Sequence, residues 1–180
     1  MSSSKVILYI AQSLDGFIAL PGDDLTFLSL VEKEGEDYGY GAFTASVDTV
    51  IMGRKTYDWV MTQVPEFPHK DKLSYIITRT TRPSEGNVHF YNGSLSSLVK
   101  DLKAKQGGHI FVDGGAEIVN MMLKEQLIDE MIISVIPVML GKGVRLFDAE
   151  RPYQNLQLVS AKTFDTGLLQ MQYKVLENNF

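Results

Sequence analysis

The chain has 180 residues, of which 44% are hydrophobic and 22% are charged, and its formal net charge is −5 at pH 7. One domain with a full core is expected at this length, and the acidic balance argues against general binding to nucleic acid or to an anionic membrane. The lack of cysteine excludes disulfides, thiolate zinc sites and cysteine nucleophiles, and the three scattered histidines predict no metal site. The apolar run "VILYIA" is too short for a signal peptide or a membrane span, so a cytoplasmic location is predicted.

The first half of the chain alternates β-rich runs with helical patterns. The run from Lys5 to Gln12 predicts a strand that ends at the turn-like "SLDG". Leu25 to Glu34 is predicted as a short helix because apolar residues recur at three-residue spacing, and "GEDYGYG" is predicted to end it. The later elements are a strand at Thr49 to Met52, a helix at Arg54 to Met61, a loop at "TQVPEFPHKD", and strands at Leu73 to Thr78 and Val88 to Tyr91.

The second half continues the alternation and then ends in strands. Leu95 to Lys105 has the pattern of an amphipathic helix that stops before two glycines. The elements after it are a strand at His109 to Val112, a helix at Ala116 to Leu123, a strand at Asp129 to Val138, and a hairpin of Leu156 to Phe164 and Leu168 to Leu176. This order predicts a single α/β domain over residues 1–180, with a mostly parallel sheet covered on both faces and a C-terminal antiparallel hairpin.

Two predicted strand-to-helix junctions contain glycine: "VIMGRKT" around Gly53, and "IFVDGGAEI" around Gly114 and Gly115. Glycine lets a ligand approach the backbone, and the first turn of a helix offers unpaired N–H groups and a partial positive charge. Because ligands of open α/β sheets bind at the carboxyl ends of strands, the two junctions could flank a pyrophosphate. Alternatively, these glycines serve only tight turns, and the second junction lacks the G-x-G-x-x-G fingerprint.

Cations accompany these junctions. Arg54 and Lys55 follow Gly53 directly, and "ITRTTR" places Arg79 and Arg82 among threonine hydroxyls just after another predicted strand. Arginines with hydroxyls suit a phosphate monoester, such as the 2′-phosphate that distinguishes NADPH from NADH. The alternative is a solvated, charged loop.

The segments "VIMGRKTY", "YIITRT" and "IFVDGGAEI", in this order, resemble the dihydrofolate reductase superfamily. "IAQSLDGFIA", "PGDDLTFL" and "VIPVMLGKGVRLF" are similar to one branch of it, the reductase half of bifunctional riboflavin-biosynthesis deaminase-reductases and its stand-alone relatives. The resemblance extends from about Val6 to Leu176 and implies a three-layer dihydrofolate reductase-like fold. Deaminase halves hold zinc through His and Cys, so a chain without cysteine is expected to be the reductase module alone.

The same resemblance implies NADPH as the cofactor and assigns residues to it. The cofactor phosphates would lie between two groups of residues: Gly53, Arg54, Lys55 and Thr56 on one side, and Gly114, Gly115, Ala116, Glu117 and Ile118 on the other. Thr78 and Arg79 match the position that meets the adenosine 2′-phosphate. Ala11, Ile18 and Ala19 match backbone positions that line the nicotinamide.

Both branches add hydride to a carbon–nitrogen double bond while the nitrogen takes a proton. A carboxylate in an apolar pocket suits the proton transfer because desolvation raises its pKa. Asp24 aligns with the carboxylate of dihydrofolate reductases, with a helix N-cap as the alternative role. Asp113 lies at a strand end beside the two glycines, and Asp15 lies in "SLDG", where a turn role is the alternative.

Two departures from the folate pattern affect the expected substrate. The loop before Asp24 is short, and Asp113 stands where dihydrofolate reductases usually have an apolar residue. The predicted acceptor is therefore a small planar heterocycle, first of all 5-amino-6-(5-phosphoribosylamino)uracil; dihydrofolate reduction and non-catalytic NADPH binding are the alternatives. Tyr38, Tyr40 and Phe43 could stack on such a ring or belong to the core. A homodimer is predicted through "DEMIISVIPVML", which is very apolar for an edge strand.

Overall fold

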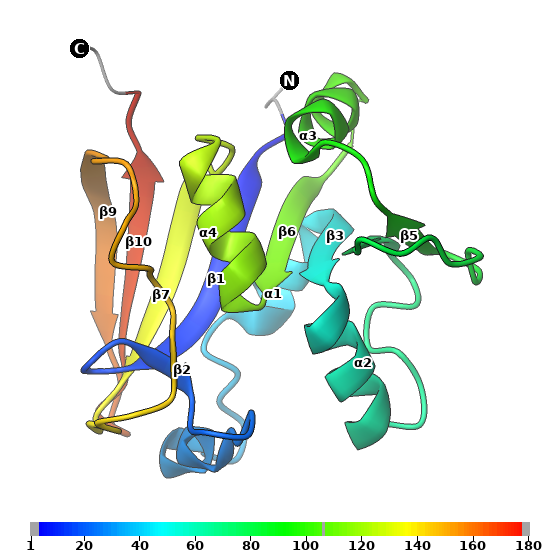
Figure 1. The fold of residues 1–180 in the computed structure, drawn as a ribbon. Helices are drawn as coiled ribbons and strands as arrows, with labels where there is room; N and C mark the ends of the chain where they lie inside the picture. Colours follow the sequence, from blue (N-terminus) through cyan, green and yellow to red (C-terminus); the bar gives the residue numbers. More distant parts are fainter. Residues whose placement is uncertain (1–3, 106, 178–180) are drawn as a thin grey trace.

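A computed structural model describes residues 4–105 and 107–177. The strands of its main sheet are β1 (Val6–Ser13), β3 (Val47–Gly53), β4 (Leu73–Ile77), β5 (Val88–Tyr91), β6 (His109–Gly114), β7 (Glu130–Ile136), β9 (Leu156–Thr163) and β10 (Leu169–Val175). They form an eight-stranded sheet in the order β5-β4-β3-β6-β1-β7-β10-β9 (Figure 1). All neighbours pair in parallel except β10, which is antiparallel to β7 and β9. The predicted fold class, with its C-terminal antiparallel hairpin, is confirmed.

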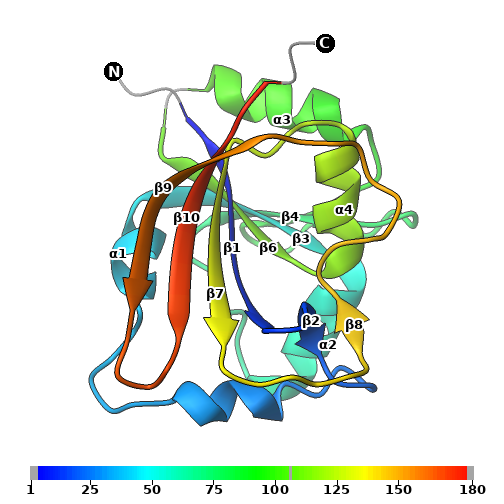
Figure 2. The ribbon, with the colours of Figure 1, turned by 90° about the vertical axis from the view of Figure 1, so that its left-hand side faces the viewer.

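Helices cover both faces of this sheet. α1 (Tyr40–Ala45) packs Phe43 against Val50 and Phe111 on one face. α3 (Leu95–Ala104) and α4 (Ala116–Lys124) pack against Ile51 and Val112 on the other, and Figure 2 shows α1 and α4 on opposite sides of the sheet. α2 (Arg54–Gln63) packs over Met52 and Ile76 near the ends of β3 and β4.

In α3, the spacing of the apolar residues and the capping serine explain why the segment forms a helix. Its buried residues Leu95, Leu98, Val99 and Leu102 follow the 3.6-residue period, so one stripe of the helix faces the core. Ser94 precedes this stripe, and its hydroxyl accepts a hydrogen bond from the Ser97 N–H at 3.3 Å. A serine cap of this kind satisfies one of the unpaired N–H groups at the helix start. The predicted amphipathic helix is confirmed.

Four short elements differ from the sequence prediction. The expected helix at Leu25 to Glu34 is a 3₁₀ helix, η1 (Thr26–Val31), which buries Phe27 and Val31. "GEDYGYG" does end it, but α1 begins within the same segment because the carboxylate of Asp37 accepts hydrogen bonds from the N–H groups of Gly39 and Gly41. β2 (Phe17–Ala19) and β8 (Val144–Arg145) form a small antiparallel pair, too short to give a periodic signal.

The reason given for a homodimer through "DEMIISVIPVML" is wrong. That run forms β7, which lies between β1 and β10 inside the sheet and buries Met131, Ile133 and Ile136. Its apolar character follows from burial on both faces of an internal strand. The edge strands of the sheet are β5 and β9, and every residue of β9 is exposed. The dimer itself stays a prediction.

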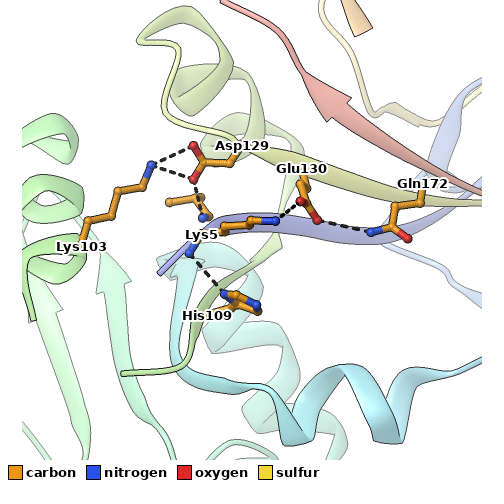
Figure 3. A network of polar contacts seen from close by, with 7 residues as sticks. Lys5, Lys103, His109, Asp129, Glu130 and Gln172 are labelled. Carbon is orange, nitrogen blue, oxygen red and sulfur yellow. Dashed lines mark hydrogen bonds and ion pairs between the residues drawn. The ribbon is translucent and has the colours of Figure 1, made fainter. Parts of the chain in front are cut away.

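Charged side chains tie the strands together at the amino ends of β1 and β7 (Figure 3). Lys103 of α3 donates to Asp129 at 2.9 Å, and the same carboxylate accepts the N–H of Val6 at 2.7 Å. Lys5 donates to Glu130 at 2.5 Å. These charged groups pair with one another and hold the strand ends in place. The opposite ends of the parallel strands, where α2 and α4 begin, are therefore where a ligand site is to be sought.

Candidate active site

The two glycine junctions of the sequence lie side by side at the carboxyl ends of β3 and β6. The strands are neighbours in the sheet, with Met52 opposite Gly114. The N–H of Gly115 donates to the Thr56 hydroxyl at 2.8 Å, which joins the start of α4 to the first turn of α2. A Cβ atom on Gly53 would lie 2.9 Å from Cγ1 of Ile118. The glycines are thus required by the close approach of the two junctions.

Both helices that start at these junctions lack a side-chain cap. The cap residues are Gly53 for α2 and Gly115 for α4, and glycine has no side chain that could accept from the helix N–H groups. Unpaired N–H groups and the positive end of the helix dipole suit an anion. Two such helix starts, joined through Thr56, could hold two linked phosphates.

The cations predicted for this site lie around the start of α2. Arg54 and Arg82 share the carboxylate of Asp58, at 2.7 and 3.0 Å. Arg79 reaches Glu117 at 3.4 Å, but its side chain is 95% exposed, so it is free to turn toward a ligand. The neighbouring Thr78 is buried, and its hydroxyl donates to the carbonyl of Thr80. Thr78 therefore shapes the loop that carries Arg79.

The residues expected at the nicotinamide lie around the end of β1. Ala19 is buried on β2, close to the backbone of Gly143, and Ile18 packs against the largest core cluster. On β1, Ile10 and Gln12 share the face opposite to that of Ala11, because side chains alternate along a strand. The Oε1 atom of Gln12 is buried and accepts no hydrogen bond from the described residues. A carboxamide N–H is a fitting donor for this acceptor. Sequence reasoning did not single out Gln12.

A cavity of about 680 Å³ opens on the other face of the sheet, between η1 and β1. Its apolar and aromatic lining consists of Tyr9, Ala11, Leu28, Val31, Tyr38, Tyr40, Ile136 and Leu168. The ring of Tyr9 stacks on Phe43 at 4.7 Å and meets the edge of Tyr40 at 5.5 Å. Tyr38 and Tyr40 thus line the cavity, where they could stack on a flat ring, whereas Phe43 is buried in the core. The lining suits a flat ring.

Polar groups at the cavity floor are already connected to one another. Gln170 donates to the Tyr9 hydroxyl, the Tyr38 carbonyl and the Ser134 hydroxyl at 3.0, 3.0 and 3.1 Å. The Tyr9 hydroxyl donates to the same Tyr38 carbonyl at 2.9 Å. Burial raises the pKa of Tyr9, so its phenol stays protonated at neutral pH. The floor is therefore fixed and uncharged.

Asp113 lies at the end of β6 beside this cavity's aromatic wall. The pairing of β6 with β3 skips Asp113, since Ile51 faces Val112 and Met52 faces Gly114. An irregularity of this kind re-aims a side chain next to a site. Oδ2 of Asp113 lies 3.2 Å from Nε2 of His69, whose side chain is 8% exposed. Burial, and then the negative charge of Asp113, raises the pKa of Tyr40 to about 12.

His69 was missed by sequence reasoning. It comes from the loop between α2 and β4, where no periodic pattern indicates burial. Its ring packs edge-on against Phe67 and Phe111, at 5.5 and 5.8 Å, which holds it toward Asp113. A buried histidine with a carboxylate partner is the sort of pair that can hold a proton.

The other two candidate acids have different positions. Asp24 is exposed at the start of η1, and its carboxylate accepts the Thr26 N–H at 2.7 Å, which lowers its pKa. Asp15 accepts from the Ser13 hydroxyl at 2.6 Å and from the N–H of Gly141 at 2.7 Å. The bond from Ser13 is the largest cause that lowers the pKa of Asp15 to about 2. None of the three candidate acids is among the described residues that line the cavity; Asp113 differs from the other two in that its charge acts on Tyr40, which does line it.

The fold and the two junctions define a class: dihydrofolate reductase-like α/β proteins with a site at the carboxyl ends of β3 and β6. Residues 4–170 match the family model described as RibD C-terminal domain. The chain therefore belongs to this family, a family of riboflavin-type reductases. The described residues include no group of three or more His, Asp or Glu that could hold a metal ion, and none of their helices is long and apolar enough to cross a membrane.

Individual proteins agree with this assignment. A Bacillus subtilis (strain 168) protein named "Uncharacterized protein YwjB" is 42% identical over 170 residues, which is 94% of this chain and 97% of that protein. The crystal structure of a putative riboflavin biosynthesis protein from Shewanella sp. PV-4 superposes with a TM-score of 0.88 at 32% identity, over 96% and 99% of the chains. Dihydrofolate reductase from Enterococcus faecalis, complexed with NADP(H), has the same fold at 15% identity, with a TM-score of 0.68 over 96% and 97%.

Proposed function

We propose that this protein is an NADPH-dependent reductase that adds hydride to a C=N bond of a small planar heterocycle of the aminopyrimidine class. This proposal rests on one observation: α2 and α4 both begin without a side-chain cap, and the hydrogen bond from the Gly115 N–H to the Thr56 hydroxyl holds the two helix starts side by side. Family membership supports a reductase. The aromatic cavity on the other side of β1 supports a flat acceptor.

The residues present fit NADPH. The N–H groups after Gly53 and Gly115 would bind the pyrophosphate, and the exposed guanidinium of Arg79 would bind the 2′-phosphate. The unpaired Oε1 of Gln12 would accept a hydrogen bond from the carboxamide. Bound NADPH supplies the hydride.

The chain itself would orient the acceptor and deliver the proton. Tyr9 and Tyr40 would hold the ring, since both phenols stay protonated and uncharged. The carbon that receives hydride leaves the adjacent nitrogen with an electron pair, and that nitrogen takes one proton. Asp113 is the group proposed to pass this proton inward, and His69 is its buried partner at 3.2 Å. Solvent restores the proton to the pair.

Two measurements test this proposal. Titration with NADPH and NADH, followed by cofactor fluorescence, is expected to give tighter binding of NADPH. Anaerobic assays then follow NADPH absorbance with an aminopyrimidine acceptor and, separately, with dihydrofolate. Turnover of the pyrimidine supports the proposal. Binding of NADPH without turnover of either compound would instead favour a protein that only binds the dinucleotide, and efficient turnover of dihydrofolate would assign folate reduction.

A further inference from the structure

The rim of the cavity is acidic. Glu32, Glu34, Glu36 and Asp37 all line it, with Lys33 as the one cation among the described lining residues. Lys33 is already paired with Asp165, outside the cavity lining, at 3.1 Å. Glu32 and Glu34 are exposed and have no ion-pair partner within residues 4–105 and 107–177. The mouth of the cavity therefore carries uncompensated negative charge.

This charge is not neutralised from within. Besides the rim residues, the lining consists of tyrosines, Ser134 and aliphatic side chains, so it offers hydrogen bonds but no further cation. The carboxylate of Asp37 accepts from Gly39 and Gly41, which fixes its position at the rim, and its charge contributes to the raised pKa of Tyr9. The negative potential thus extends from the rim to the floor.

The glycine junctions have an excess of positive charge. Arg54, Lys55, Arg79 and Arg82 gather there; Arg54 and Arg82 pair with Asp58, and Arg79 pairs with Glu117. Lys55 is exposed and has no ion-pair partner in the described part of the chain. A polyanion is attracted to one half of the site and repelled from the other. Charge alone would therefore favour an anionic ligand at the glycine junctions and disfavour one in the cavity.

From this contrast we infer that the acceptor carries no phosphate: it is a neutral or amine-bearing planar heterocycle that enters past the Glu32 and Glu34 carboxylates. The inference rests on the proposed function and departs from the phosphoribosylated uracil expected from the sequence. A phosphate monoester brings almost two negative charges at neutral pH. In water, each unit charge of the phosphate at contact distance from a carboxylate would weaken binding by about fivefold.

The test compares 5-amino-6-(ribosylamino)uracil with and without its 5′-phosphate, by calorimetry on the protein loaded with NADP⁺, which cannot donate hydride. The unphosphorylated compound is expected to bind about tenfold more tightly at low salt, and the difference is expected to shrink at high salt, where the Debye length is about 3 Å at 1 M. A Glu32→Gln, Glu34→Gln double variant should lose most of the difference. Glu125→Gln with Glu150→Gln is the matched control, because both are exposed glutamates outside the cavity lining.

Each outcome bears on the inference. Equal or tighter binding of the phosphorylated compound overturns it, and so does a preference that survives in the Glu32, Glu34 double variant. Binding of neither compound at millimolar concentration also overturns it. Titration of the same protein with NADPH reports separately on the proposed function, so a failed acceptor preference is not mistaken for a failed reductase assignment.

Discussion

Replacing Asp113 by asparagine tests the proposed proton path with little change of shape. Asparagine is nearly isosteric and can still accept a hydrogen bond from His69, which lies 3.2 Å away. The carboxylate side chain is 27% exposed, so the folded state loses about 1 kcal/mol or less. The capacity to hold a proton is lost altogether. General acid–base catalysis contributes roughly 10²–10⁴-fold, and the expected fall in kcat lies in that range.

The assay is NADPH oxidation with the unphosphorylated aminouracil, together with thermal unfolding and NADPH titration of each variant. NADPH affinity should stay unchanged, because Asp113 lies on the cavity side of β6. Asp24→Asn is the matched control: the same chemical change at another candidate acid should leave kcat near wild type and change stability little, because the asparagine oxygen can still accept the Thr26 N–H. A folded Asp113→Asn protein with kcat within twofold of wild type would refute the proton path.

Three further changes probe the cofactor half and the loops. Arg79→Ala should reduce the preference for NADPH over NADH by about tenfold to hundredfold, the value of a charge-assisted hydrogen bond, whereas Lys100→Ala on α3 should leave it intact. Gly115→Ala places a methyl group 2.9 Å from the Thr56 hydroxyl, so it should destabilise the folded protein by about 1–3 kcal/mol and weaken NADPH binding. In a Thr56→Ala background the added loss of stability should be smaller, because the clashing hydroxyl is absent. The pKa of Asp15 is lowered to about 2 in the folded protein. The carboxylate therefore stabilises the fold above about pH 4, near the ordinary pKa of aspartate, and this stabilisation is lost as the pH falls toward 2. Asp15→Asn should reduce the dependence of the unfolding free energy on pH between about pH 4 and pH 2, as measured by chemical denaturation at several pH values.

The alternation of strands and helices could be read from the sequence because each long element has a clear period. The stripe of α3 and the internal strands β1, β3 and β7 are examples. The sequence predicted a short helix for η1 without its type, because a spacing of three residues fits both α-helices and 3₁₀ helices. α1 was missed because its cap residue is Gly39 and the glycines of this segment indicate a break; the Asp37 carboxylate accepts from the N–H groups of Gly39 and Gly41.

The site was predictable only where a motif lies within one junction. Gly53 and Gly115 could be named, and the resemblance implied that their junctions flank one ligand, but no local pattern shows that β3 and β6 are neighbours, since α2, β4, β5 and α3 lie between them in the chain. His69 lies in an irregular loop, and its burial depends on Phe67 and Phe111, which come from different segments. The role of each candidate acid likewise depends on contacts between segments that are distant in the sequence. Asp113 gains a buried partner through a contact 44 residues away in sequence, which no local pattern encodes.

β1 separates the two halves of the proposed site. Ala11 lines the cavity, whereas the adjacent Gln12 faces the opposite side of the sheet. A cofactor at the glycine junctions and an acceptor in the cavity could therefore meet only beyond the strand ends, where β1 stops at Ser13. The buried hydroxyl of Ser13 accepts the Phe17 N–H at 3.0 Å and donates to Asp15 at 2.6 Å, while Asp15 also holds the N–H of Gly141. Asp15 thus fixes the loop around which hydride would pass, so its contribution to the reductase would be one of shape, with the proton left to Asp113.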